Sequence, residues 1–178
     1  TFLGMLPYLL GHYLGFLDAL FESISGFTGT GATVFVTLDG VPYSILFWRM
    51  MTAWIGGLGI IVIFIALLPA TGQSAITMYN AESSAQGSER VLPRLKDLTS
   101  VLFRIYVVLT GAAFLAFFLC GMNALDAVNH AMSTIGTGGF STYNASAAHF
   151  ESPAIELWMS LFMFISGGSF GLYYRMYK

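Results

Sequence analysis

Two short stretches rich in glycine and threonine contain the residues best suited to bind an ion. They are Thr28-Gly29-Thr30-Gly31 and Gly136-Thr137-Gly138-Gly139. Glycine accepts backbone dihedral angles that turn successive carbonyl oxygens toward one axis. A ring of such carbonyls can replace the hydration shell of a dehydrated cation. The residues of both stretches are therefore candidate ligands for a metal cation, and this chemistry requires no organic cofactor.

Each glycine-rich stretch follows a short apolar segment that is predicted to be helical. These segments run from Leu17 to Phe27 and from Leu125 to Ile135, and each has an aspartate in its first turn, Asp18 or Asp126. Both are too short to cross a bilayer, which takes about 20 apolar residues. Half-length helices of this kind would point their negative C-terminal ends at the glycine stretches and favour positive charge there.

The composition indicates the environment of these segments. Of the 178 residues, 56% are hydrophobic and 9% are charged, whereas soluble domains carry roughly 25% charged residues. The mean hydropathy is +0.74. A net charge of −2 argues against a nucleic-acid partner, and the single cysteine, Cys120, excludes an internal disulfide. The sequence predicts an integral membrane protein that contacts lipid, and it disfavours a soluble enzyme.

Three stretches are long and apolar enough to span a membrane. They run from Ile45 to Pro69, from Leu98 to Gly121 and from Pro153 to Tyr174. The opening stretch, Phe2 to Leu14, is shorter and is interpreted as the end of a truncated helix. We therefore expect the sequence to be an internal segment of a longer protein.

The basic residues predict the orientation of these helices. Connections 35–44 and 141–152 contain no Lys or Arg, whereas six of the seven basic residues lie between 90 and 104 or at the end of the sequence, at Arg90, Arg94, Lys96, Arg104, Arg175 and Lys178. The positive-inside rule then places residues 71–97 in the cytoplasm and the two uncharged connections outside. Both glycine stretches are thus expected to enter the membrane from its outer face.

The order of elements occurs twice, which predicts an internal repeat. A shift of 108 residues superimposes Leu17-Asp18-Ala19 on Leu125-Asp126-Ala127, Ser25 on Ser133, and Gly31 on Gly139. A shift of 110 superimposes Trp48 on Trp158 and Gly57 on Gly167. Repeats in a membrane protein place a shared site on the axis that relates them. The predicted divisions are a first pore repeat over 1–70, a cytoplasmic connection over 71–97 and a second pore repeat over 98–178.

Several motifs resemble those of Trk-type bacterial potassium-uptake transporters. Residues 21–33, FESISGFTGTGAT, are similar to the first pore loop of that family, and residues 126–142, DAVNHAMSTIGTGGFST, to the second. The helices that follow the two loops are matched by FWR at 47–49, WIGGLGI at 54–60 and SPAI at 152–155. The resemblance covers nearly the whole chain and identifies it as a member of the Trk/Ktr/HKT superfamily.

The resemblance implies an all-α membrane protein built from helix–pore-loop–helix units of the potassium-channel type, with about two of the family's four repeats present. It implies potassium transport through a carbonyl-lined selectivity filter, in which Gly31 and Gly139 match the central glycines. Multi-pass insertion in the bacterial inner membrane, a homodimer and a cytosolic nucleotide-binding regulatory ring protein are also implied. Two repeats cannot close a fourfold filter, so this polypeptide alone is not expected to conduct.

Arg49 is the most costly residue of the spanning segments, because it places a charge inside a membrane helix. Charges in such helices usually pair or line a pathway. Glu22 is the favoured partner; snorkelling to the interface and a direct role in the ion path are the alternatives. His130 is expected to pack and to make a backbone hydrogen bond rather than to bind a metal ion. Gly56, Gly57 and Gly59 suit close helix packing.

Two functions other than potassium transport remain open at this point. The first is an intramembrane serine protease that uses Ser25 or Ser133 with His12 or His130, although no acidic residue is placed to orient the base. The second is a membrane assembly module that uses its glycines only for packing. Packing alone explains neither the half-length helices nor their repetition, so transport is the favoured function.

Overall fold

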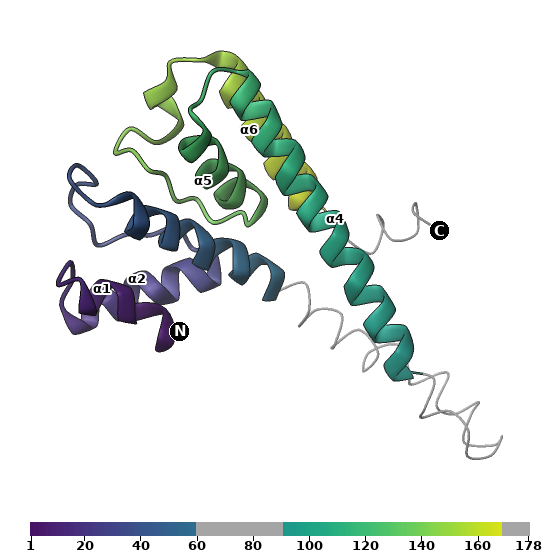
Figure 1. Ribbon diagram of the computed structural model, residues 1–178, viewed down its shortest axis with the longest axis horizontal. Coiled ribbons are helices and arrows are strands. Elements are labelled where there is room, and N and C mark those ends of the chain that lie inside the picture. The colour runs from purple at the N-terminus through teal and green to yellow at the C-terminus, as the bar shows by residue number, and fades with distance from the viewer. Residues whose placement is uncertain (60–90, 169–178) are drawn as a thin grey trace.

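The computed structural model describes residues 1–59 and 91–168, and every regular element in these ranges is helical (Figure 1). In chain order they are the 3₁₀ helix η1 (Leu3–Met5), α1 (Leu6–Leu10), α2 (Phe16–Thr28), a helix over 43–59, α4 (Val91–Leu119), α5 (Ala124–Ile135), the 3₁₀ helix η2 (Ser146–Phe150) and α6 (Pro153–Ser166). The predicted all-α fold is confirmed.

The predicted half-length helices are also confirmed. α2 has 13 residues and α5 has 12, which at 1.5 Å per residue makes each about 20 Å long, less than the roughly 30 Å of a bilayer core. Asp18 and Asp126 lie in their first turns. α5 has an additional cap, because the Asn123 side chain accepts a hydrogen bond from the Asp126 N–H.

Helix boundaries differ from the prediction at two places. Helical structure at the start of the chain ends at Leu10 and not at Leu14, because Gly11 ends the helix and His12 has a left-handed φ of 56°. α4 begins at Val91, ahead of the predicted Leu98. Polar residues that precede an apolar run can continue the same helix, so the apolar run alone does not mark where α4 begins.

Parts of the predicted spans lie outside the described residues. The helix over 43–59 begins just before Ile45, but residues 60–69 of that predicted span are not described. The same holds for most of the predicted connection over 71–97 and for residues 169–174 at the end of the third span. α6 begins at the predicted Pro153.

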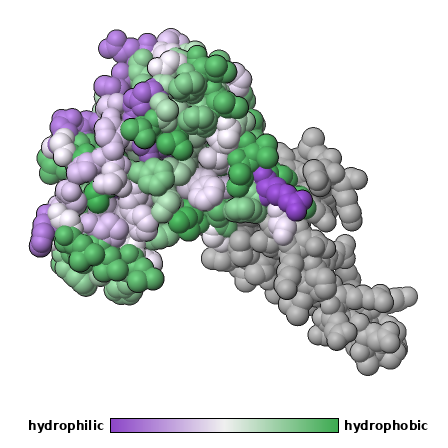
Figure 2. All heavy atoms as spheres, viewed as in Figure 1, coloured by the Kyte–Doolittle hydropathy of each residue, from purple (hydrophilic) through white to green (hydrophobic). Residues whose placement is uncertain are grey.

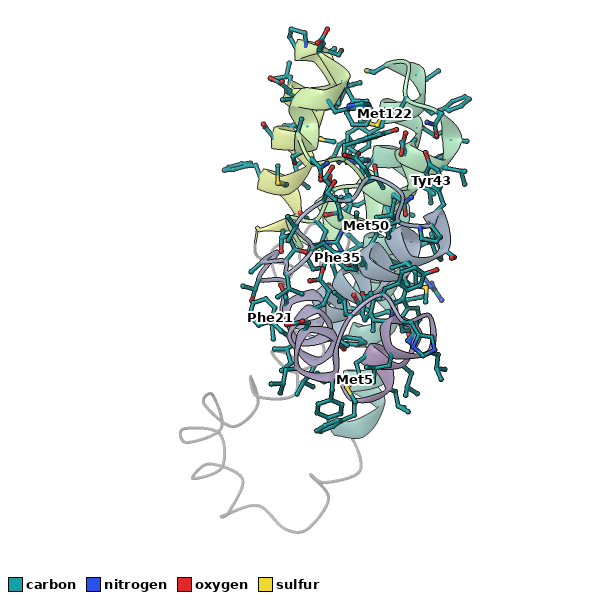
Figure 3. All side chains as sticks on the ribbon, turned by 90° about the vertical axis from the view of Figure 1, so that its left-hand side faces the viewer. Met5, Phe21, Phe35, Tyr43, Met50 and Met122 are labelled. Carbon is teal, nitrogen blue, oxygen red and sulfur yellow. The ribbon has the colours of Figure 1, made fainter. Side chains whose placement is uncertain are left out.

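Each repeat has its own apolar core, and a third cluster joins them. In the second repeat, α4, α5 and α6 contribute buried side chains such as Phe117, Ile135 and Phe162. The joining cluster brings Met50 and Ala53 of the helix over 43–59 against Met132 of α5 and Phe140 of the following loop. Figure 3 shows Met50 and Phe35 between Met5 of the first repeat and Met122 of the second.

Large apolar side chains are exposed along the helices, as expected for a surface that contacts lipid. Leu119 of α4 and Phe164 of α6 are each 82% exposed, and Leu17 of α2 is 75% exposed. Figure 2 shows hydrophilic residues toward the left-hand side, where Figure 1 places the interhelical loops. Among the described residues, one helix segment, Ser100–Leu119, is long and apolar enough to cross a membrane, and Pro153–Ser166 is a shorter apolar helix.

Candidate functional site

The first glycine loop, residues 28–34, leaves α2 through a glycine in a left-handed conformation. Gly29 has φ 68° and Gly31 has φ 73°, in a region of backbone angles that residues other than glycine rarely adopt. The Thr30 N–H donates to the Ser25 carbonyl over 3.0 Å. The Ser25 hydroxyl donates to the carbonyl oxygen of Ala32 over 2.6 Å, which fastens the loop to the helix that precedes it.

The second glycine loop, residues 136–142, repeats this geometry. Thr137 and Gly139 have φ values of 50° and 69°. The Gly138 N–H donates to the Ser133 carbonyl over 2.9 Å, and the Ser133 hydroxyl donates to the carbonyl oxygen of Phe140 over 2.6 Å. Every one of these atoms lies 108 residues after its counterpart in the first loop, so the structure confirms the predicted repeat at the level of individual hydrogen bonds.

The two glycine loops lie side by side, although 108 residues separate them in sequence. A Cβ atom built on Gly31 would lie 2.7 Å from the carbonyl oxygen of Gly138 and 3.2 Å from the Cα atom of Gly139. A Cβ atom on Gly29 would lie 3.7 Å from the Thr137 carbonyl oxygen. The structure thus brings the predicted ligand residues of both repeats into one place, backbone against backbone.

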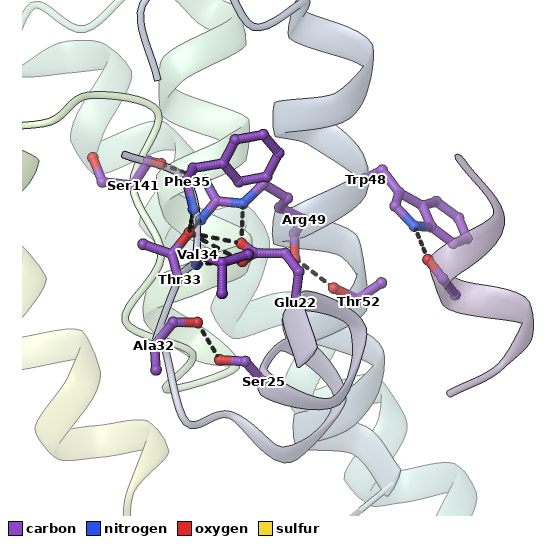
Figure 4. Close-up of polar contacts among 11 residues, drawn as sticks. Glu22, Ser25, Ala32, Thr33, Val34, Phe35, Trp48, Arg49, Thr52 and Ser141 are labelled. Carbon is purple, nitrogen blue, oxygen red and sulfur yellow. Dashed lines mark hydrogen bonds and ion pairs between the residues drawn. The ribbon is translucent and has the colours of Figure 1, made fainter. Parts of the chain in front are cut away.

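A buried ion pair supports the first glycine loop from behind (Figure 4). The Arg49 Nε donates to Glu22 Oε1 over 2.7 Å, and the two side chains are 1% and 0% exposed. Thr33 Oγ1 lies 3.0 Å from both carboxylate oxygens, and the Val34 N–H donates to Glu22 Oε2 over 3.1 Å. The predicted pair of Arg49 with Glu22 is confirmed, and snorkelling of Arg49 to the interface is not observed.

Arg49 also contacts the second glycine loop. Its Nη1 donates to the backbone carbonyl oxygen of Ser141 over 3.4 Å, and its Nη2 donates to the Thr33 hydroxyl over 3.1 Å. The guanidinium carbon lies 4.4 Å from the ring centre of Phe140, in cation–π contact. One buried side chain therefore links the segments that follow Gly31 and Gly139. The sequence signalled the partner of Arg49 but not this link.

A buried carboxylate supports the second glycine loop. Asp126 accepts hydrogen bonds from the Thr142 hydroxyl over 3.1 Å and from the Tyr143 hydroxyl over 2.7 Å, and it also contacts the Asn123 side-chain amide. The hydrogen bond to Asp126, together with burial, raises the pKa of the Tyr143 phenol, so this hydroxyl stays protonated and donates. The prediction assigned Asp126 only a place in the first helical turn.

His130 is buried, and its ring nitrogens contact one backbone oxygen and one side-chain oxygen. Nδ1 lies 2.8 Å from the carbonyl oxygen of Asp126, and Nε2 lies 3.1 Å from the Ser141 hydroxyl. The predicted backbone hydrogen bond is confirmed. Within the described ranges, no group of three or more His, Cys, Asp or Glu side chains could hold a metal ion.

Two of the three glycines assigned to helix packing have this role. A Cβ atom on Gly56 would overlap the backbone of Phe27, and one on Gly57 would lie 2.7 Å from the Tyr106 hydroxyl and 3.0 Å from the Cα atom of Gly136. Both glycines let the helix over 43–59 pack closely against Phe27 and Gly136, where the glycine loops begin. Gly59 has no neighbour within 4 Å among the described residues, so a packing role is not observed there.

The serine protease alternative is not supported by the geometry. Ser25 and Ser133 both donate to loop carbonyls, and His130 contacts Ser141 and not Ser133. No described contact orients either serine as a nucleophile beside a base, which catalysis of this kind requires. Both serines instead act as anchors of the loops.

The fold and the paired loops define a helical membrane transport protein with repeated pore-loop units. The family model of TrkH, a cation transport protein, matches residues 3–178. The chain belongs to this family, which consists of transporters and not of enzymes.

Relatives and a solved structure agree with this assignment. The chain is 43% identical over 176 residues to the Trk system potassium uptake protein TrkH of Escherichia coli K12, covering 97% of the chain and 36% of that protein. It is 38% identical over 162 residues to TrkG of the same strain, covering 90% and 33%. The crystal structure of the potassium transporter TrkH from Vibrio parahaemolyticus superimposes with a TM-score of 0.82 at 41% identity, covering 96% of this chain and 34% of the other.

Proposed function

We propose that this sequence forms part of a transporter that moves potassium across the bacterial inner membrane through a carbonyl-lined filter. In this proposal Thr28, Gly29, Thr30, Gly31, Gly136, Thr137, Gly138 and Gly139 supply carbonyl or hydroxyl oxygens to the ion. The observation that carries it is the close approach of Gly31 to Gly138 and Gly139, each loop having left-handed backbone. The names of the relatives support potassium as the ion.

The chemistry follows from what surrounds the loops. Half-helices α2 and α5 end at the glycine loops, so their negative ends favour a cation there. Carbonyl oxygens offer a potassium ion a replacement for its water shell only where they are held in place. Hydrogen bonds from Ser25 and Ser133, together with the link through Arg49, hold them in this proposal.

The chain spans 36% of the length of the Escherichia coli TrkH protein that it matches. The remaining repeats and the partners of the complete protein are therefore part of the proposal. We assign 1–70 and 98–178 to the first and second of four pore repeats, with 71–97 in the cytoplasm. Two further repeats would complete the filter, and the complete protein would form a homodimer that binds a cytosolic nucleotide-binding ring protein. Exposed apolar side chains on α4 and α6 suit lipid or these further repeats.

Growth at low potassium tests this function. A full-length Trk protein carrying this sequence in the matching region is expressed in cells that lack potassium uptake systems. We expect growth at micromolar to low millimolar potassium, and we expect Gly31→Ala or Gly139→Ala to abolish it while the protein still reaches the membrane. Growth that does not depend on either glycine would contradict the proposal.

A further inference from the structure

Glu22 and His130 occupy equivalent positions in the two repeats, 108 residues apart, and each contacts the same part of its own glycine loop. Thr33 and Ser141, each two residues after a central glycine, place their hydroxyl oxygens 3.0 Å from the Glu22 carboxylate and 3.1 Å from His130 Nε2. These hydroxyls also accept backbone hydrogen bonds, Thr33 from the Phe35 N–H over 3.2 Å and Ser141 from the Tyr143 N–H over 3.1 Å.

The contacts of His130 fix where its proton lies. Nδ1 is 2.8 Å from the carbonyl oxygen of Asp126, which can only accept, so Nδ1 carries the proton. The Ser141 oxygen already accepts from the Tyr143 N–H, and its own proton needs an acceptor. Among the described residues, His130 Nε2 is the acceptor within reach of this proton. A neutral ring with its proton on Nδ1 therefore satisfies the hydrogen bonds of the Asp126 carbonyl, His130, the Ser141 hydroxyl and the Tyr143 N–H together.

We propose that His130 is a positioning residue of the second glycine loop: as a neutral imidazole protonated on Nδ1, it accepts the hydrogen bond of the Ser141 hydroxyl and so holds the loop as Glu22 holds the first. The proposal rests on the proposed potassium function for its consequence, which is ion discrimination. Its structural half, the protonation of His130 and its bond to Ser141, can be tested without transport.

The different residue types follow from the charges around each position. Glu22 is a buried carboxylate beside the Arg49 guanidinium, which compensates its charge at 2.7 Å. Among the described residues position 130 has no such partner, because Arg49 contacts the second loop at the Ser141 carbonyl oxygen and the Phe140 ring and not at His130. Asp126, one turn earlier, already places a buried carboxylate there. A neutral acceptor avoids burying a second uncompensated charge, which is costly.

Two substitutions of similar size separate the acceptor from simple packing. In His130→Gln the amide can reach the place of Nε2 and accept from Ser141, whereas the shorter side chain of His130→Asn reaches only the place of Nδ1. In the full-length transporter we expect His130→Gln to keep the potassium-to-sodium transport ratio and His130→Asn to lower it about tenfold, as loss of one buried hydrogen bond predicts. Ser141→Ala is expected to match His130→Asn, and the double variant to be no worse.

Equal loss of discrimination in His130→Gln and His130→Asn, or additive losses in the double variant, would overturn the proposal. The second measurement is the nitrogen NMR spectrum of labelled histidine in the full-length protein, with His130→Gln used to assign the signal. We expect a protonated Nδ1 and an unprotonated Nε2 at neutral pH; a proton on Nε2 would refute the assignment. If the unsubstituted protein fails to transport potassium while this spectrum is as expected, the proposed function fails and the role of His130 stands.

Discussion

Gly31 and Gly139 lie against each other with no side chain between them. A Cβ atom on Gly139 would be 3.5 Å from the Cα atom of Gly31, and a Cβ atom on Gly31 would be 2.7 Å from the carbonyl oxygen of Gly138. Both residues have left-handed φ values, which L-amino acids with side chains adopt at a cost. Backbone conformation therefore favours glycine at both positions, and lack of space requires it at Gly31 as well.

Substitution of either central glycine by alanine should disable ion discrimination. In Gly31→Ala the new methyl group must displace the Gly138 carbonyl, and the backbone strain adds about 1 kcal/mol or more. We expect the potassium-to-sodium uptake ratio of the full-length transporter to fall at least tenfold in Gly31→Ala. Uptake of rubidium and sodium tracers in whole cells measures this ratio.

Two other glycines separate the causes of that effect. Gly40 has φ 81° but no neighbour within 4 Å among the described residues, so Gly40→Ala adds strain without a clash. Gly111 lies within α4 and has neither a left-handed φ nor a near neighbour in the described ranges. We expect both variants to keep the unsubstituted ratio. A fall in Gly40→Ala as large as in Gly31→Ala would contradict an effect through the loop contact.

Removing one charge of the buried ion pair should destabilise the protein strongly, and removing both charges should destabilise it little further. Arg49→Gln or Glu22→Gln leaves one buried charge without its partner, which costs about 3–5 kcal/mol. We expect the double variant to be no less stable than either single variant, because it leaves no unpaired charge. Thermal unfolding of the purified transporter measures the difference.

Arg104→Gln is the control for the ion pair, because Arg104 is exposed on α4. It should change the unfolding temperature little. Losses from Arg49→Gln and Glu22→Gln that add in the double variant would show that the two charges act independently, against the structure.

The serine anchors of the two loops should be equivalent. Ser25→Ala and Ser133→Ala each remove a hydroxyl that donates to a loop carbonyl over 2.6 Å, at a cost of about 1 kcal/mol. We expect similar losses of stability and of potassium selectivity from both. Ser160→Ala is the control, since the exposed Ser160 hydroxyl donates within its own helix. Intact ion flux in Ser25→Ala, with loss of a hydrolytic activity, would instead favour the enzyme.

The loops beyond the glycines should be held together by Asn144. Its side chain accepts from the Leu38 N–H over 2.8 Å and donates to Thr37 and Asp39 of the first repeat. In Asn144→Ala we expect the Leu38 amide to exchange with deuterium at least several-fold faster, because its acceptor is gone. Unchanged exchange at Leu38 would show that this contact does not hold the loops in solution.

Periodicity, length and charge were sufficient to predict the order of elements. The thickness of the bilayer sets the length of a spanning helix, so apolar segments of full and half length can be told apart in the sequence. The pair of Glu22 with Arg49 was predictable for the same reason: a buried charge needs a partner. The shift of 108 predicted that Ser25 and Ser133 are equivalent, but their hydroxyls could serve several acceptors. Only the path of each loop shows that Ala32 and Phe140 are the acceptors.

Contacts between the repeats could not be read from the sequence. Arg49 reaches a backbone carbonyl at Ser141, and a carbonyl leaves no trace in residue type. The hydrogen bonds of Asn144 join residues more than 100 positions apart that no charge or hydrophobic pattern connects. The early end of α1 at Leu10 depends on the left-handed conformation of His12, which a residue other than glycine seldom adopts.

An ion located by diffraction tests the central proposal most directly. Crystals of the full-length transporter carrying this sequence are soaked in rubidium or thallium, whose anomalous scattering distinguishes them from water. The proposal predicts a peak coordinated by backbone oxygens of residues 28–31 and 136–139 in the two glycine loops, which Gly31→Ala removes. Strong peaks elsewhere along the pathway, with none between these loops, would contradict it.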